Sequence, residues 1–231
     1  MLSLPSTRTW RRLTVWLHVL TSVGWMALAA SLAVLLALAA ADPAARASAV
    51  LAAHHLDAVL LAPLATGSAL TGIVLAAATP YGLFHHWWVT VKFGITLVQL
   101  YLGIFVLSGM LDGARVAPAS APPAALLTTT LLMVSAIAFQ AWVSIAKPWG
   151  RTPWTPGRPK PGTGPRWMFA AACAAVVVDL AVGFVLGAPM PVAAVAVLPA
   201  VLIGVRARRS GDPGRAPGPE RTRATRSLPG R

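Results

Sequence analysis

The sequence predicts an all-α, multi-pass transmembrane protein made of a four-helix bundle and a C-terminal two-helix hairpin. Hydrophobic residues make up 57% of the 231 residues and charged residues only 11%, against about 25% charged residues in an average soluble domain. The mean hydropathy is +0.70. The apolar residues form long runs, and about 20 of them cross ~30 Å of hydrocarbon as a helix. These observations exclude a soluble domain and bulk disorder, and the single cysteine, Cys173, excludes a disulfide scaffold.

The first predicted span covers residues 13–40. It follows Arg8, Arg11 and Arg12 and ends before Asp42. A cleaved signal peptide is the alternative for this segment. Its apolar stretch is 28 residues long, whereas the apolar region of a signal peptide has about 7–15 residues. We therefore expect the segment to remain as a membrane span.

The next three spans complete the four-helix bundle. The second covers residues 48–78 and contains Pro63, which is expected to kink the helix. The third covers residues 87–110 and the fourth residues 124–146. Residues 112–123 are rich in proline and small side chains, which predicts a short loop between these two spans.

The composition changes after the fourth span. Residues 147–166 hold five basic residues, six prolines and no acidic residue, which predicts an extended cytoplasmic linker. Residues 167–187 form a fifth predicted span, and residues 190–205 form a short apolar segment that is either a sixth span or a re-entrant segment. The predicted organisation is a bundle at 1–146, a linker at 147–166, a transmembrane hairpin at 167–205 and a disordered basic tail at 206–231.

The distribution of charge predicts the orientation. The formal net charge is +13, and the tail alone carries eight arginines. With six spans and a cytoplasmic N-terminus, 17 of the 19 basic residues face the cytoplasm, as basic loop residues usually do. We therefore expect a protein of the cytoplasmic membrane with both termini inside, and a linker and tail that contact anionic lipid headgroups. Basic clusters beside membrane spans do not indicate a nucleic-acid partner, and homo-oligomerisation stays open.

Polar residues at one depth of the inner half suggest a cofactor site. His18, Lys92 and Gln140 come from three different spans and lie about 8–10 Å from their inner ends. His86 precedes the third span beside two tryptophans and is a further candidate ligand. The alternative is that Lys92 extends to the interface and that the other side chains only join neighbouring helices.

A second polar group lies toward the outer face. His54, His55 and Asp57 are in the second span and Asp179 is in the fifth. His54 and Asp57 are three residues apart, so they share a helix face. Imidazole and carboxylate ligands suit Cu(II) or Zn(II), which makes these four residues the candidate metal ligands. A His–Asp ion pair that neutralises two buried charges is the alternative.

One stretch resembles a known family. Residues 14–25, Thr-Val-Trp-Leu-His-Val-Leu-Thr-Ser-Val-Gly-Trp, are similar to the first helix of bacterial proteins related to the copper-resistance protein CopD and to HemJ-type protoporphyrinogen oxidases. Thr71-Gly72, Tyr81-Gly82 and the Trp88-Val-Thr-Val-Lys92 stretch resemble the same group, so the resemblance covers about residues 13–146. It implies haem b or copper as cofactor, with His18 and Lys92 at the positions that matter for haem association. The extra spans and the basic linker depart from that pattern.

The sequence thus predicts a multi-pass membrane protein that holds haem or a metal ion within its bundle. No phosphate-binding loop, zinc-protease helix or nucleophile elbow is present in the sequence. We therefore expect a binding protein rather than an enzyme and assign no catalytic residue. A HemJ-type haem oxidoreductase, a CopD-like copper transport or tolerance protein and a lipid-interacting scaffold remain as alternatives.

Overall fold

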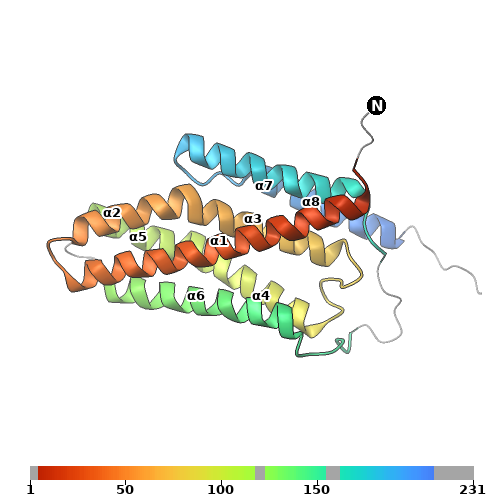
Figure 1. Cartoon of the computed structure of the whole chain (residues 1–231), viewed down its shortest axis with the longest axis horizontal. Helices are drawn as coiled ribbons and strands as arrows, with labels where there is room; N and C mark the ends of the chain where they lie inside the picture. The colour runs from red at the N-terminus through yellow and green to blue at the C-terminus, as the bar shows by residue number, and fades with distance from the viewer. Residues whose placement is uncertain (1–4, 118–122, 155–161, 211–231) are drawn as a thin grey trace, which may run out of the picture.

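The computed structural model describes residues 5–117, 123–154 and 162–210. This part of the chain is helical and contains no strand, which confirms the predicted all-α fold. Figure 1 shows an elongated bundle in which the long helices run side by side along the longest axis. The hairpin of α7 and α8 packs on the side of α1 and α3, away from α4 and α6.

Five stretches of helix in the described residues are long and apolar enough to cross a membrane, in agreement with the membrane assignment. The first is α1 (Thr7–Ala41). The second joins α2 (Arg46–Leu56), the π-helix η1 (Asp57–Leu61) and α3 (Ala62–Ala77). The third joins α4 (Trp87–Tyr101), the π-helix η2 (Leu102–Leu107) and α5 (Ser108–Val116). The remaining two are α6 (Pro123–Ala146) and α7 (Arg166–Leu186), and a further helix, α8 (Val192–Ser210), follows.

The helices are longer than the apolar runs that predicted them. Helix α1 begins at Thr7, where the Ser6 hydroxyl caps it by accepting from the Thr9 amide at 3.2 Å. Helix α5 extends to Val116, so the loop expected from residue 112 begins several residues later and Asp112 is helical. The charged residues at these ends lie just beyond the apolar runs, and the helical backbone continues through them.

The two π-helices interrupt the second and third spans. In η1 the amide of Ala62 donates to the carbonyl of Asp57, five residues back. Pro63 follows directly and has no amide to continue the regular ladder, so the expected distortion at Pro63 takes the form of a π turn. In η2 the Ser108 amide donates to the Gly103 carbonyl in the same way.

Two apolar clusters hold the ends of the molecule. One joins α1, α3, α7 and α8 around the fully buried Phe169 and Val176. The other joins α1, α2, α5 and α6 around Leu36 and Val50. We call the end of the molecule that carries Arg11, Arg166 and Arg206 the basic end, and the end with the turn between α1 and α2 the far end (Figure 1).

Helix α8 returns the chain to the basic end. Gly187 ends α7 in the left-handed conformation, with φ of 64°, which suits glycine because it has no Cβ to clash. Arg208 near the end of α8 donates to the Thr163 carbonyl at 3.3 Å, just before α7 starts. The predicted hairpin is therefore antiparallel over its whole length. Its second helix has 19 residues, or about 28 Å at 1.5 Å per residue.

Candidate functional site

The far half of the bundle encloses an apolar cavity of about 260 Å³. Its walls come from all four spans of the bundle and from the loop between α7 and α8. Cavities between helices are where bundle proteins place their ligands. The lining residues include Trp25, Asp57, Gln99, Gly103, Ser108, Thr130 and Met133.

Both π-helices line this cavity. Asp57 and Leu61 come from η1, and Gly103, Ile104 and Leu107 come from η2. A π turn inserts one extra residue into a helix and so turns the helix face that follows, and π turns occur often at functional sites. The two irregular segments of the bundle thus meet at its cavity.

Most polar groups in the cavity wall have partners within the helices. Gln99 is only 3% exposed, and its amide donates to the Met133 carbonyl at 3.1 Å. Thr130 donates to the Leu126 carbonyl at 2.8 Å. These contacts hold the wall together.

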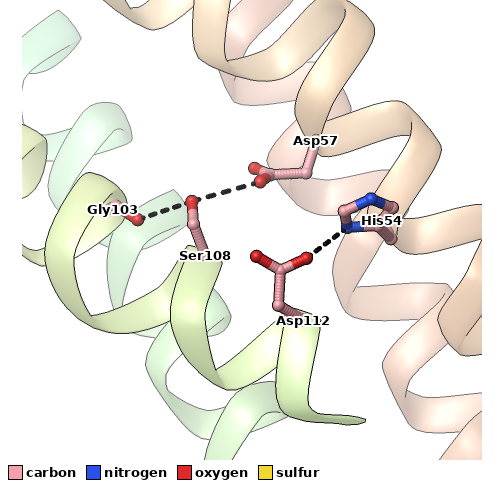
Figure 2. Close-up of polar contacts among 5 residues, drawn as sticks. All are labelled: His54, Asp57, Gly103, Ser108 and Asp112. Atoms are coloured by element: carbon pink, nitrogen blue, oxygen red, sulfur yellow. Dashed lines mark hydrogen bonds and ion pairs between the residues drawn. The ribbon is translucent and has the colours of Figure 1, made fainter. Parts of the chain in front are cut away.

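Asp57 is the exception. Figure 2 shows its carboxylate facing Ser108 across the gap between η1 and α5. The Ser108 hydroxyl lies 3.4 Å from Asp57 Oδ2 but 2.9 Å from the Gly103 carbonyl oxygen. A hydroxyl has one proton, and the shorter contact takes it. Among the described residues, the half-buried Asp57 carboxylate therefore has only one long polar contact.

His54 pairs with Asp112 and not with Asp57. His54 Nδ1 lies 3.3 Å from Asp112 Oδ1, one helical turn from the Asp57–Ser108 contact (Figure 2). The sequence correctly placed His54 and Asp57 on one face. It did not identify their partners Ser108 and Asp112, although the spacing of four residues between these two was a signal that they share a face toward the second span.

Asp179 has a different role from the predicted one. It is 4% exposed, and its two oxygens accept from the Ala193 and Ala194 amides, each at 2.8 Å. These are the second and third residues of α8, so Asp179 acts as an N-cap supplied by α7. Its carboxylate also lies at the positive end of the α8 dipole. Both oxygens are thus engaged with backbone.

The four candidate metal ligands do not form one ligand set. His55 is exposed, and its ring centroid lies 5.9 Å from that of His54. Within the described ranges no group of three or more His, Cys, Asp or Glu side chains is placed to hold a metal ion. The arrangement gives no support to a copper or zinc centre.

The predicted inner layer is divided between two helix seams. In the first, His18 Nδ1 on α1 lies 3.0 Å from the Ser68 carbonyl oxygen and 3.1 Å from the Thr71 hydroxyl on α3. Ser22, one turn further along α1, bonds Ser68 at 2.7 Å. The imidazole lies against Gly72, where an added Cβ would come within 2.9 Å of His18 Cε1.

The second seam joins α4 to α6. Lys92 donates to the Ser144 hydroxyl, which donates to the Gln140 carbonyl at 2.8 Å. The Gln140 side chain accepts from Thr96 at 2.9 Å and donates to Gln99.

His86 lies outside both seams, in the turn before α4. Its Nδ1 contacts the Tyr81 carbonyl oxygen at 2.9 Å, and its backbone pairs with Arg151. Lys147 lies 5.8 Å from the centroids of the Tyr81 and Trp88 rings. The first residues of the predicted linker therefore pack on this turn instead of extending freely, whereas residues 155–161 lie outside the described part.

No protein-family model, curated protein or solved structure matches this chain. The resemblance to the CopD and HemJ group therefore stays a prediction, and the function has to be argued from the cavity and the two polar seams.

Proposed function

We propose that this protein binds a small, mainly apolar molecule inside its transmembrane bundle, in the cavity beside Asp57. The observation that carries the proposal is the coincidence of a cavity, two π-helices and a carboxylate with incomplete hydrogen bonding at one place. Each of these features costs stability, and a ligand that fills the cavity offsets the cost. The protein is a binding protein in this proposal, and no residue is assigned a catalytic role.

Native mass spectrometry of gently purified protein tests the proposal. We expect the wild-type chain to retain a small adduct that Gly103→Leu lacks, because an added Cβ at Gly103 lines the cavity and meets nothing closer than Met133 Cε at 3.9 Å. Gly109→Leu is the matched control, since Gly109 is exposed and has no neighbour within 4 Å. A bare wild-type chain, or an adduct that both variants keep, would contradict the proposal.

We also propose that the basic end faces the cytoplasm and contacts anionic lipid headgroups. The N-terminal arginines, Lys147 with Arg151, and the end of α8 all lie at this end of the molecule. Basic residues beside membrane spans favour the cytoplasmic side and attract anionic lipids. A salt-sensitive association of the purified protein with phosphatidylserine vesicles, absent with phosphatidylcholine, tests the lipid contact.

A haem protein of the HemJ type is the second candidate. The observation that favours it is the His18 contact with the Ser68 carbonyl, which holds the proton on Nδ1 and leaves the Nε2 lone pair available. Histidine ligands of metals are commonly oriented in this way. His18 does not line the cavity, however, and packs closely on Gly72, so the described residues supply one ligand and no preformed space for a porphyrin.

An absorption spectrum separates the two candidates. Haem on His18 gives a Soret band and, after dithionite reduction, an α band that His18→Ala removes. A featureless spectrum from folded protein that has been offered haem rules the second candidate out and leaves the cavity proposal intact.

A further inference from the structure

We infer that the cavity selects a lipophilic organic monocation, whose positive centre lies at the Asp57 carboxylate. This inference rests on the proposed function and adds the chemical class of the ligand. Three features of the described residues support it. These are the charge of the cavity wall, the charges just outside the wall, and the apolar lining, which does not suit a bare metal ion.

Asp57 is the one ionisable side chain among the described residues that line the cavity. Within the described part of the chain, its side chain makes one polar contact, the long one with Ser108, whose proton is already used by Gly103. A carboxylate in apolar surroundings costs free energy unless it is paired or hydrogen-bonded. A cationic ligand provides the partner that the chain itself does not place there.

The neighbouring charges favour the same sign. Asp112 and His54 form the adjacent contact, at 3.3 Å, with 57% and 25% of their side chains exposed. The group of Asp57, Asp112 and His54 holds two carboxyl groups and one imidazole, so with both carboxyl groups ionised its net charge is negative whichever form His54 takes. A negative group beside the cavity attracts a cation and repels an anion.

The apolar wall argues against a bare metal ion. Hard cations such as Ca²⁺ and Mg²⁺ need six or more oxygen ligands, from protein or water. Here Asp57 is the one carboxylate among the described residues of the wall, and Gln99 and Thr130 are held by contacts within the wall. An organic cation needs one counter-charge and apolar contact for the rest of its surface. Trp25 adds an aromatic side chain, which binds quaternary ammonium groups well.

A matched pair of probes tests the charge preference. Benzyltrimethylammonium and 2,2-dimethylpropylbenzene have the same shape, and the first carries a positive nitrogen where the second has carbon. Both are measured by equilibrium dialysis against the full-length protein in phosphatidylcholine nanodiscs, with binding to empty nanodiscs subtracted. We expect the cation to bind at least tenfold more tightly than the neutral probe.

Three variants assign the effect. Asp57→Asn keeps the shape and removes the charge, so it should weaken cation binding at least tenfold and leave the neutral probe unchanged. Asp112→Asn makes the same change outside the cavity wall and should weaken cation binding less than threefold. Gly103→Leu fills the cavity and should abolish the binding of both probes, with Gly109→Leu as the folded control.

The outcomes separate the inference from the proposed function. Equal binding of the two probes, both lost in Gly103→Leu, overturns the cation selectivity and keeps the cavity as a ligand site. Cation binding that Asp57→Asn leaves intact also overturns the inference. Absence of binding by either probe to folded wild-type protein overturns the inference and the cavity proposal together.

Discussion

At the scale of single residues, buried polar side chains of this protein join helices through backbone groups. His18 contacts a carbonyl of α3, Gln99 donates to a carbonyl of α6, and Asp179 accepts from two amides of α8. In hydrocarbon there is no water to satisfy such groups, so each contact has a high cost when it is lost. Asp57 differs because its contact is long and shared.

Substitution of Asp179 tests how much one such contact contributes to the stability of the protein. Asp179→Ala leaves the Ala193 and Ala194 amides without their acceptor at the start of α8, and loss of a helix cap costs about 0.5–2 kcal/mol. We expect a lower unfolding temperature in detergent, with Asp179→Asn between the two because it keeps one acceptor oxygen. Thermal scanning of tryptophan fluorescence measures the change.

The control for Asp179 is Asp42→Ala. Asp42 also accepts from a backbone amide, that of Ala44 at 2.8 Å, but in an exposed turn where water replaces the bond. Its unfolding temperature should stay close to that of the wild type. An Asp179→Ala protein as stable as Asp42→Ala would show that the cap does not hold the hairpin in place.

Gly72 tests the packing of the His18 seam. Gly72→Ala places a Cβ within 2.9 Å of His18 Cε1, and overpacking of a tight contact costs about 1–3 kcal/mol. We expect a lower unfolding temperature than wild type, and a recovery when His18→Ala is added to remove the clash. Gly94→Ala in α4, where nothing lies within 4 Å of the added Cβ, should be neutral or slightly stabilising.

The double variant decides whether the two residues interact. If Gly72→Ala and His18→Ala destabilise the protein additively, their side chains do not share the contact seen between α1 and α3. Energies that fail to add show direct coupling, as expected for neighbours.

At the scale of elements, the sequence was sufficient for the spans and insufficient for how they face one another. Runs such as residues 124–146 predict a helix directly, because an apolar run of that length usually crosses a membrane as an α-helix. The π turns at Asp57 and Leu102 are not visible in the apolar pattern, because each adds one residue to an already apolar helix. Pro63 predicted a distortion of the second span, but not that the distortion is a π turn.

Helix rotation explains which site residues were missed. The pairing of His54 with Asp112 depends on how α2 and α5 turn toward each other, and the two π turns contribute to that rotation. Asp179 shows the same limit, since a buried carboxylate in a span suits a metal ligand and a helix cap equally well. Only the position of α8 separates the two roles.

At the scale of the whole molecule, the two ends of the bundle differ in charge and in the features they carry. The basic end carries the arginines of α1, the residues after α6 and the end of α8, and the far half contains the cavity with Asp57. This difference in charge is the basis of the proposed orientation in the membrane. The proposed ligand site lies in the far half, away from the basic end.

The orientation can be tested with single cysteines in a Cys173→Ala background. Ala44→Cys lies in the exposed far-end turn, whereas Gly150→Cys and Arg208→Cys are exposed at the basic end. In right-side-out membrane vesicles we expect a membrane-impermeant maleimide to label Ala44→Cys at once and the other two only after permeabilisation. The reverse pattern would overturn the cytoplasmic placement of the basic end, because the labels would report it outside.

Arg208→Cys carries additional information because α8 is the shorter helix of the hairpin and has arginines near its end. If α8 returns to the basic end in the membrane, as the Arg208 contact with Thr163 requires, Gly150→Cys and Arg208→Cys will respond alike. Labelling of Arg208→Cys together with Ala44→Cys would mean that α8 leaves α7 in the bilayer. The Asp179 cap would then be broken, and the Asp179→Ala protein should show the same labelling pattern as the wild type.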